Sequence, residues 1–227
     1  MRFYGCDIHA FPEGSDSPSR LALAARRLGY SGIVISNHSG YELLFLPEAV
    51  QRVKGIDVAW GTEVVSKDQR ALIGKTSALR RSYEVVAVHG GFEAINRAAC
   101  ENPNVDILLH PEAGRSSLTI AMARSAKLNQ VAIGFDLSPM IRLRGGPRTR
   151  WLELVARNLA MARKFRLPMV ISADVRSHLD LRSPRDLMAL AELAGMEDKE
   201  ALAALRYPGE VVSLNRRRWA ASGVEVL

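Results

Sequence analysis

Groups that bind metal ions or transfer protons lie at the ends of seven short apolar runs in this sequence. In chain order they are Asp7 with His9, Asn37 with His38, Glu63, His89, His110, Asp136 and Asp174. If the runs are parallel strands of one barrel, their carboxyl ends share one face, where such folds place their active sites. Imidazoles and carboxylates gathered there would suit metal-assisted hydrolysis of a phosphate ester, because bound ions activate water and neutralise phosphate charge.

A structural interpretation fits the same residues. Histidines at the mouth of a barrel often only hydrogen-bond to neighbouring loops, and residue type does not distinguish them from metal ligands. Both interpretations stay open at the level of pattern and spacing.

The seven apolar runs have the length and composition of parallel strands buried on both faces. They span residues 3–8, 32–36, 58–65, 84–88, 105–109, 130–135 and 168–172. Helical patterns alternate with them, which leaves either an open doubly wound sheet or a closed barrel. Neither a GxGxxG nor a GxxxxGK[ST] motif follows a run, so a nucleotide-binding sheet has no support. We expect a single α/β domain over residues 1–227, a TIM-like barrel of about seven parallel strands with surrounding helices.

Helix boundaries can be read in the intervening segments. Ser17 is the N-cap of one predicted helix, and Gly29 ends it. Ser183 begins another with a capping box. A third helix over residues 199–205 should end before Pro208, because proline cannot continue the backbone hydrogen bonding.

The charge balance points to a polyanionic partner. The 227 residues include 31 Lys and Arg against 24 Asp and Glu, a formal net charge of +7. Arg predominates over Lys, and its planar guanidinium group suits phosphate recognition. Cys6 and Cys100 lie in apolar surroundings without a CxxC partner, so we expect reduced core residues. With neither a signal peptide nor an apolar run long enough to cross a bilayer, we expect a soluble, cytoplasmic protein with no membrane contact.

Several strand-end motifs resemble those of the PHP superfamily of metal-dependent phosphoesterases, which adopt a distorted seven-stranded barrel. They are Asp7-Ile8-His9, Asn37-His38, Gly61-Thr62-Glu63, His110-Pro111 and Ser172-Ala173-Asp174. The sequence departs from that family at three ligand positions. Phe11 stands where the second His of His-x-His belongs, Asn37 replaces the Asp of Asp-His, and Arg176 replaces the His of Asp-x-His. These departures predict against a hydrolytic centre with two or three metal ions.

The order and spacing of further segments resemble the ribonuclease P protein component 3 family in its archaeal form. They are residues 28–32, 88–91, 96–99, 105–111, 129–133, 180–187 and 195–196, and the resemblance extends from the first strand to about Pro208. It implies a PHP-like barrel that serves as a non-catalytic subunit, supporting the RNA that removes 5′ leaders from precursor tRNA. It also implies a small α/β partner subunit, in a heterodimer or heterotetramer, and other ribonuclease P proteins. Catalytic residues, a metal and other cofactors are not expected, and precursor tRNA would be met only indirectly.

If the partner is a folded RNA, arginines should meet its phosphates with little reading of bases. The candidate RNA-binding residues are Arg142, Arg144, Arg148 and Arg150 in a Gly-Pro segment predicted as a loop, Arg176 and Arg182 after the seventh strand, and Arg216 and Arg217 near the C-terminus. Two alternatives remain. His9, His38, Glu63 and His110 keep open a PHP-type phosphoesterase acting on a small phosphate ester, and a barrel that binds only proteins is a third hypothesis.

Overall fold

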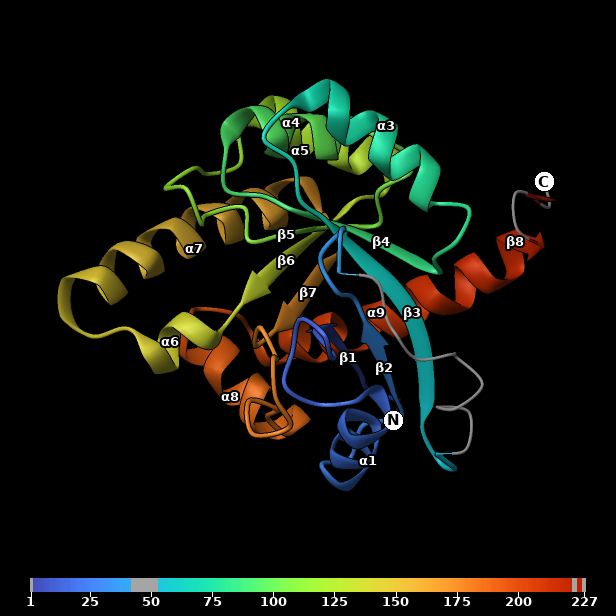
Figure 1. Ribbon diagram of the computed structural model, residues 1–227. Helices are drawn as coiled ribbons and strands as arrows, with labels where there is room; N and C mark the ends of the chain where they lie inside the picture. The colour runs from blue at the N-terminus through green and yellow to red at the C-terminus, as the bar shows by residue number, and fades with distance from the viewer. Residues whose placement is uncertain (1, 42–52, 222–223, 226–227) are drawn as a thin grey trace.

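Seven parallel strands form one sheet in sequential order in the computed structural model, which describes residues 2–41, 53–221 and 224–225. The strands are β1 (Tyr4–Ile8), β2 (Gly32–Ile35), β3 (Asp57–Val64), β4 (Val85–His89), β5 (Ile107–Leu109), β6 (Ala132–Asp136) and β7 (Met169–Ser172). Ile8 forms a parallel bridge with Val175, just beyond β7, so the sheet curls into a nearly closed barrel (Figure 1). The expected strands and the barrel are confirmed.

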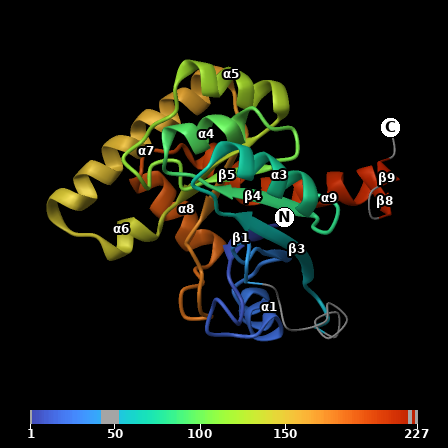
Figure 2. The same ribbon diagram turned by 45° about the horizontal axis from the view of Figure 1, so that its top comes forward.

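Helices surround the barrel on its outer side. They are α1 (Pro18–Arg27), α3 (Gln69–Leu79), α4 (Glu93–Cys100), α5 (Ile120–Asn129), α6 (Ser138–Arg142), α7 (Gly145–Phe165), α8 (Pro184–Leu193) and α9 (Asp198–Arg218). Figure 2 shows α3, α4, α5 and α7 following one another around the outside of the sheet. The predicted caps are confirmed, since the Ser17 side chain accepts a hydrogen bond from the Arg20 amide and Ser183 forms a capping box with Asp186. No helix in the described ranges is long and apolar enough to cross a membrane.

The core has an outer and an inner part. The outer part packs the helices against the strands, and its largest buried side chains include Phe135 and Met122. The inner part fills the barrel with small and medium side chains: Cys6, Val34, Ala59, Val85, Ala87, Ile107, Leu109, Ala132 and Val170. Both cysteines are buried and free, as expected.

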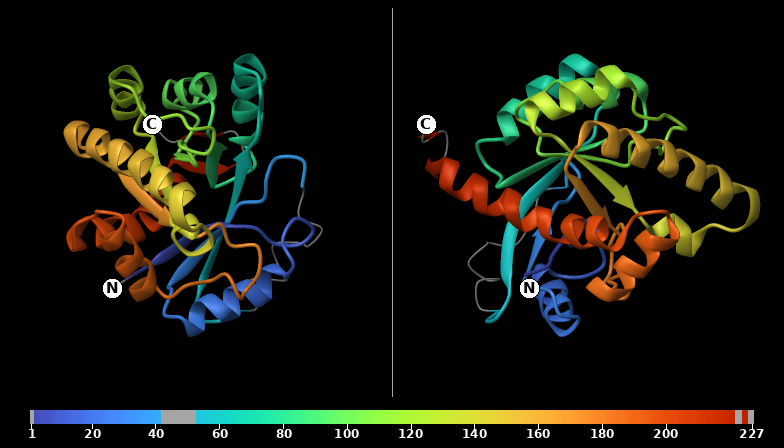
Figure 3. Two further views of the ribbon diagram at one scale, coloured as in Figure 1. Left: turned by 90° about the vertical axis from the view of Figure 1, so that its left-hand side faces the viewer. Right: turned by 180° about the vertical axis from the view of Figure 1, so that it is seen from behind.

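Helix α9 closes the amino end of the barrel. Val211 and Val212 pack against the inner core, and Asn215 donates a hydrogen bond to the Glu84 carbonyl at the start of β4. Figure 3 shows the helix crossing the barrel. The prediction that a helix would end before Pro208 is wrong, because α9 continues through this buried proline. The apolar surface that α9 buries offsets the hydrogen bond that Pro208 cannot donate.

A two-stranded hairpin follows α9. Strands β8 (Trp219–Ala221) and β9 (Val224–Glu225) are antiparallel.

Candidate functional site

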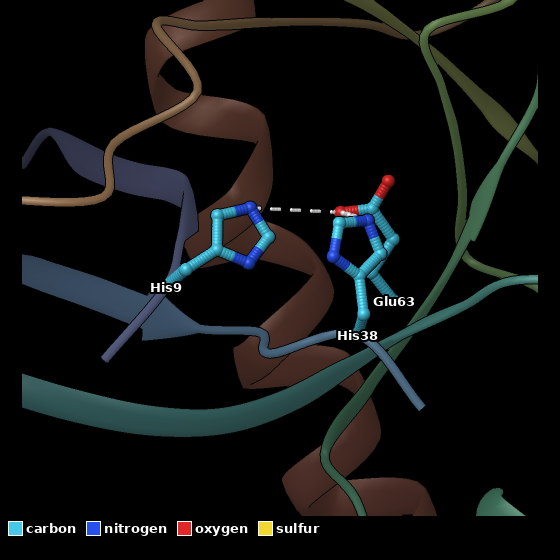
Figure 4. A group of neighbouring side chains, drawn as sticks. All are labelled: His9, His38 and Glu63. Atoms are coloured by element: carbon cyan, nitrogen blue, oxygen red, sulfur yellow. Dashed lines mark ion pairs between the residues drawn. The ribbon is translucent and has the colours of Figure 1, made fainter. Parts of the chain in front are cut away.

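Three loops and strand ends bring His9, His38 and Glu63 together at the carboxyl end of the barrel. His9 follows β1, His38 follows β2, and Glu63 lies near the end of β3 (Figure 4). The Glu63 Oε2 atom is 3.8 Å from His9 Nε2 and 3.5 Å from His38 Nε2. The two imidazole rings are stacked, with their centroids 5.0 Å apart. These strand-end residues therefore share one small space, as the spacing predicted.

Two further histidines extend this group around Glu63. His89 Nδ1 is 2.6 Å from Glu63 Oε1, and His110 Nε2 is 3.8 Å from the same oxygen. His110 also lies 3.5 Å from a carboxylate oxygen of Asp7. We call the five residues His9, His38, Glu63, His89 and His110 the histidine cage.

Neighbouring carboxylates favour the charged form of three histidines of the cage, His9, His38 and His110. Burial lowers the pKa of His9, but hydrogen bonds with Asp7 and Glu13 outweigh it and raise the pKa to about 10. Burial also lowers the pKa values of His38 and His110, but carboxylates outweigh it there too and raise both. At neutral pH the His9 ring is therefore an imidazolium ion, and the same carboxylates shift His38 and His110 toward that form.

The carboxylates shift in the opposite direction. Burial raises the pKa of Glu63, but hydrogen bonds with His38 and His89 outweigh it and lower the pKa to about 2. Burial likewise raises the pKa of Asp7, but the charge of His110 outweighs it and holds the pKa well below its usual value. The cage is thus a buried network in which opposite charges pair with one another, and this pairing offsets the cost of removing them from water.

Two acidic groups beside the cage behave differently. Burial raises the pKa of Asp136 to about 6, although the nearby charge of His110 opposes it. Burial also raises the pKa of Glu112 to about 7. The Trp151 indole N–H opposes that rise from beside the carboxylate, but neither Glu112 Oε2 nor Trp151 Nε1 makes a hydrogen bond of normal geometry within the described part of the chain.

Some donor atoms of this region fit a metal ion. Three overlapping sets of described residues offer ligand atoms within 4.8 Å of one another: His9, His38 and Glu63; Glu63, His89 and His110; and Asp7, His9 and Asp174. Two buried atoms of the first set have charged neighbours but no hydrogen bond of normal geometry among the described residues: His9 Nδ1 lies 3.2 Å from Glu13, and Glu63 Oε2 lies 3.5 Å from His38. The donor types suit a single borderline cation such as zinc.

The three departures from the PHP motifs explain why a larger metal cluster does not fit. The Asn37 side chain bonds both ways with the Ala10 backbone, at 2.8 Å each, so it fastens a loop. The Arg176 guanidinium donates to Asp174 at 3.1 Å and to Glu13 at 3.2 Å. A fixed cation therefore already pairs with Asp174, one of the two carboxylates of the third set. Phe11 is 44% exposed and supplies no ligand.

The segment with Arg142, Arg144, Arg148 and Arg150, predicted as a loop, forms a corner between two helices, α6 and α7. Arg142 ends α6, Arg144 lies in the two-residue link, and Arg148 and Arg150 belong to the first turns of α7. The loop prediction is wrong because the Gly-Gly-Pro sequence begins α7 instead of extending the link; proline fits the first helical turn. Figure 1 shows this corner projecting from the carboxyl end of the barrel.

The arginines of this corner differ in how many hydrogen bonds they make within the chain. The Arg144 side chain donates to the Ile141 and Leu143 carbonyls, and Arg148 donates to that of Leu143. Arg150 is exposed, without a hydrogen bond or ion pair to another described residue. The α6–α7 corner thus presents guanidinium groups to solvent with few acidic partners.

The second predicted cluster lies beside the first. Arg142 donates to Asp174 at 3.1 Å, and the same carboxylate accepts from Arg176. Arg182, farther along the loop after β7, donates to the Leu179 and Leu181 carbonyls. The structure therefore brings the first two arginine clusters together, as expected.

The third cluster lies at the other end of the barrel. Arg216 pairs with Asp57 at 2.7 Å and with Glu84, and Arg217 donates to the Ser213 carbonyl. The Trp219 side chain, next to these arginines in the sequence, lies outside the described side chains. The third cluster does not join the other two.

Glu13 is a site residue that the strand-end pattern did not identify. Its carboxylate lies 3.2 Å from His9 Nδ1, bonds the ring and backbone of His38, and pairs with Arg176. It belongs to the loop after β1, four residues past His9. A search for acids following each strand end would have found it.

Comparisons with known proteins agree with this geometry. The model of the family described as RNase P subunit p30 matches residues 2–220. Ribonuclease P protein component 3 of Methanosarcina mazei is 42% identical over 99% of this chain and 95% of its own length. The Haloarcula marismortui protein of that name is 34% identical, over 96% of this chain and 93% of its own length.

Solved structures give the same result for the fold. A chain in a cryo-EM structure of archaeal ribonuclease P with mature tRNA matches with a TM-score of 0.79 and 25% identity, covering 98% of this chain and 97% of that one. Histidinol phosphate phosphatase from Lactococcus lactis matches with a TM-score of 0.57 and 14% identity, over 86% of this chain and 95% of that one, which shows a shared fold. The chain therefore belongs to the RNase P subunit p30 family.

Proposed function

We propose that this chain is a protein subunit of ribonuclease P that supports the catalytic RNA in removing 5′ leaders from precursor tRNA. The observation that carries the proposal is the likeness, over 98% of the chain, to a chain of archaeal ribonuclease P with mature tRNA. The relatives named ribonuclease P protein component 3 support the same role.

The barrel contributes no catalytic residues in this proposal. The Arg176 guanidinium neutralises Asp174 and Glu13, where the PHP motifs would place a metal ligand. The carboxylates around His9 and His38 raise the pKa of both rings, and a protonated ring has no lone pair for a metal. The histidine cage is then a structural network that fixes the loops at the carboxyl end.

The RNA-facing surface in this proposal is the α6–α7 corner together with the loop after β7. Exposed arginines there, Arg144 and Arg150 above all, can meet backbone phosphates. Arg142, Arg148, Arg176 and Arg182 would complete the same surface. The small α/β subunit of ribonuclease P is the proposed protein partner.

Reconstitution tests the proposal directly. Cleavage of 5′-labelled precursor tRNA is measured with the cognate RNA, the small partner subunit and the full-length chain, together and singly. We expect no cleavage by the chain without RNA, and faster cleavage by the RNA when both proteins are present. Robust metal-dependent cleavage by the RNA-free chain, or hydrolysis of an aryl phosphate, would instead favour the phosphoesterase hypothesis.

Metal removal separates a structural cage from a metal centre. The purified chain is treated with EDTA, dialysed and returned to the reconstitution with the usual Mg²⁺ for the RNA. We expect the treated chain to support cleavage as well as the untreated chain does. Loss of support that only zinc or manganese restores would contradict the structural assignment of the cage.

A further inference from the structure

A pocket of about 330 Å³ adjoins the histidine cage, with which it shares His110, and lies between the start of α7 and the loop after β5. Its α7 wall consists of residues three or four positions apart, which share one face of a helix. They are Pro147, Arg150, Trp151 and Leu154. Pro139 and Leu143 extend this wall from the α6 side, and residues 110–115 supply the opposite one. The pocket is of a size that holds one small group and excludes a duplex.

Two unsatisfied polar atoms belong to the residues that line this pocket. Glu112 is 6% exposed and Trp151 is 7% exposed, and the indole N–H lies close enough to the Glu112 carboxylate to oppose the rise in its pKa; neither Glu112 Oε2 nor Trp151 Nε1 makes a hydrogen bond of normal geometry among the residues described. Asp136, which also lines the pocket, is satisfied because both of its oxygens accept hydrogen bonds from Ser138. Buried polar groups are normally paired, so one orphan acceptor and one orphan donor call for a ligand that offers both.

The rim of the pocket is positively charged. Arg115 and Arg150 line it from opposite walls, and both are exposed. Neither has a side-chain hydrogen bond or ion pair to another residue of the described ranges. Two unpaired guanidinium groups at the mouth of an apolar pocket suit a phosphate group attached to whatever enters it.

We propose that this pocket, the base pocket, takes one unpaired nucleotide of the bound RNA, with the base inside and its phosphate at the rim. The proposal rests on the proposed function and deepens it. Each nucleobase carries a hydrogen-bond donor next to an acceptor on its Watson–Crick edge, which complements Glu112 and Trp151. Bases splayed out of an RNA are commonly held by apolar or aromatic contacts and by hydrogen bonds to that edge.

The contacts favour a nucleotide over a protein side chain. A partner's side chain that enters an apolar pocket has no need of two unpaired arginines at the rim, whereas a nucleotide brings a phosphate at that distance from its base. A slight shift could also pair Glu112 with Trp151 directly, and the experiment must separate that case.

The experiment uses the reconstituted enzyme and chemical probing of its RNA. Dimethyl sulfate and a carbodiimide together modify the Watson–Crick edges of unpaired bases. Ala113→Trp fills the pocket from its exposed wall, and Arg150→Ala removes a rim charge. Arg157→Ala is the matched control, because Arg157 is an exposed arginine on α7 that does not line the pocket. Affinity for the RNA is measured in parallel.

We expect the wild-type chain to protect one unpaired base that Ala113→Trp and Arg150→Ala both leave reactive. Ala113→Trp should weaken RNA affinity by about five- to tenfold, the low end of what losing one stacked base costs. Arg157→Ala should keep the protection. Glu112→Gln should leave the same base reactive. If Glu112 and Trp151 only bonded to each other, this substitution would lower the melting temperature and leave the protection of the base unchanged.

Three results would overturn the proposal. Identical reactivity with wild-type and Ala113→Trp chains, while both chains speed cleavage, would refute the pocket but leave the subunit role intact. Unchanged reactivity with weaker assembly of a protein partner would assign the pocket to that partner. Failure of the wild-type chain to stimulate the RNA at all would refute the proposed function itself, and the base pocket with it.

Discussion

The two ends of the barrel carry charged residues in different ways. At the amino end, α9 lies across the strands, Val211 and Val212 plug the interior, and Arg216 is matched by Asp57 and Glu84. At the carboxyl end, buried imidazolium and carboxylate groups lie beside a pocket with unsatisfied polar atoms and exposed arginines. Charges at one end hold the chain together, while charges at the other remain available to a ligand. We therefore propose that the chain binds its ligand at the carboxyl end.

The largest effect on stability is expected where α9 closes the amino end of the barrel. Val212 is 1% exposed, so Val212→Asp would place a carboxylate in the apolar interior. We expect a loss of about 4 kcal/mol or more in the free energy of unfolding, since an unpaired buried charge is among the costliest changes. Denaturant titration measures it, with Ser213→Asp on the exposed side of the same helix as the control. A loss below about 1 kcal/mol would mean that α9 does not seal the barrel.

The cage should give a characteristic dependence of stability on pH. The pKa of His9 is raised to about 10, so its contribution is complete below its unfolded value near 6.5 and disappears as the pH rises toward 10. The pKa of Glu63 is lowered to about 2, so its contribution is complete above about 4.5 and disappears as the pH falls toward 2. We expect maximal stability between roughly pH 4.5 and 6.5 from these two groups.

A single substitution checks the alkaline side of that profile. His9→Gln removes the titrating ring, so the fall in stability between pH 6.5 and 10 should become shallower by up to about 1.4 kcal/mol per pH unit. Denaturant titrations at several pH values measure the slope. The partly exposed His178, which pairs with Asp16 away from the cage, provides the control substitution His178→Gln. Equal slopes for wild type and His9→Gln would show that the ring is neutral in the folded protein.

The carboxyl-end arginines should affect binding more than stability. We expect replacement of Arg142, Arg144, Arg148 and Arg150 by Ala to weaken RNA association without unfolding the chain. The slope of log affinity against log salt should become shallower by up to roughly 0.7 to 0.9 for each phosphate that the variant no longer neutralises. Arg150 should contribute most, because Arg142, Arg144 and Arg148 already bond within the chain. A salt slope equal to that of wild type would mean that the α6–α7 corner faces solvent.

The strands and their polar ends could be predicted because parallel strands leave a local signal of apolar runs that end in polar groups. The Asn96 side chain accepts from the Gly91 amide and donates to the Pro111 carbonyl, and so it ties two loops together. The helix end at Pro208 was wrongly predicted because the lost backbone hydrogen bond is a local cost that the sequence shows. The packing that outweighs it involves strands far away in the sequence. The base pocket had no sequence signal, because Glu112 and Trp151 meet only through the tertiary fold.

The smallest effect is expected at the amino-end ion pairs. Arg216→Ala leaves Asp57 bonded to the Tyr4 hydroxyl and Glu84 bonded to the Trp60 amide, so neither carboxylate is stranded. All three partners are partly exposed, and we expect a loss of at most about 1 kcal/mol in the free energy of unfolding. RNA affinity and its salt slope should not change, because this arginine is neutralised within the chain. The hypothesis that Arg216 and Arg217 contact RNA predicts the opposite, a slope reduced by roughly 0.7 to 0.9 for each. Measuring Arg216→Ala and Arg217→Ala in the reconstituted enzyme decides between them, and a reduced slope would place RNA at both ends of the barrel.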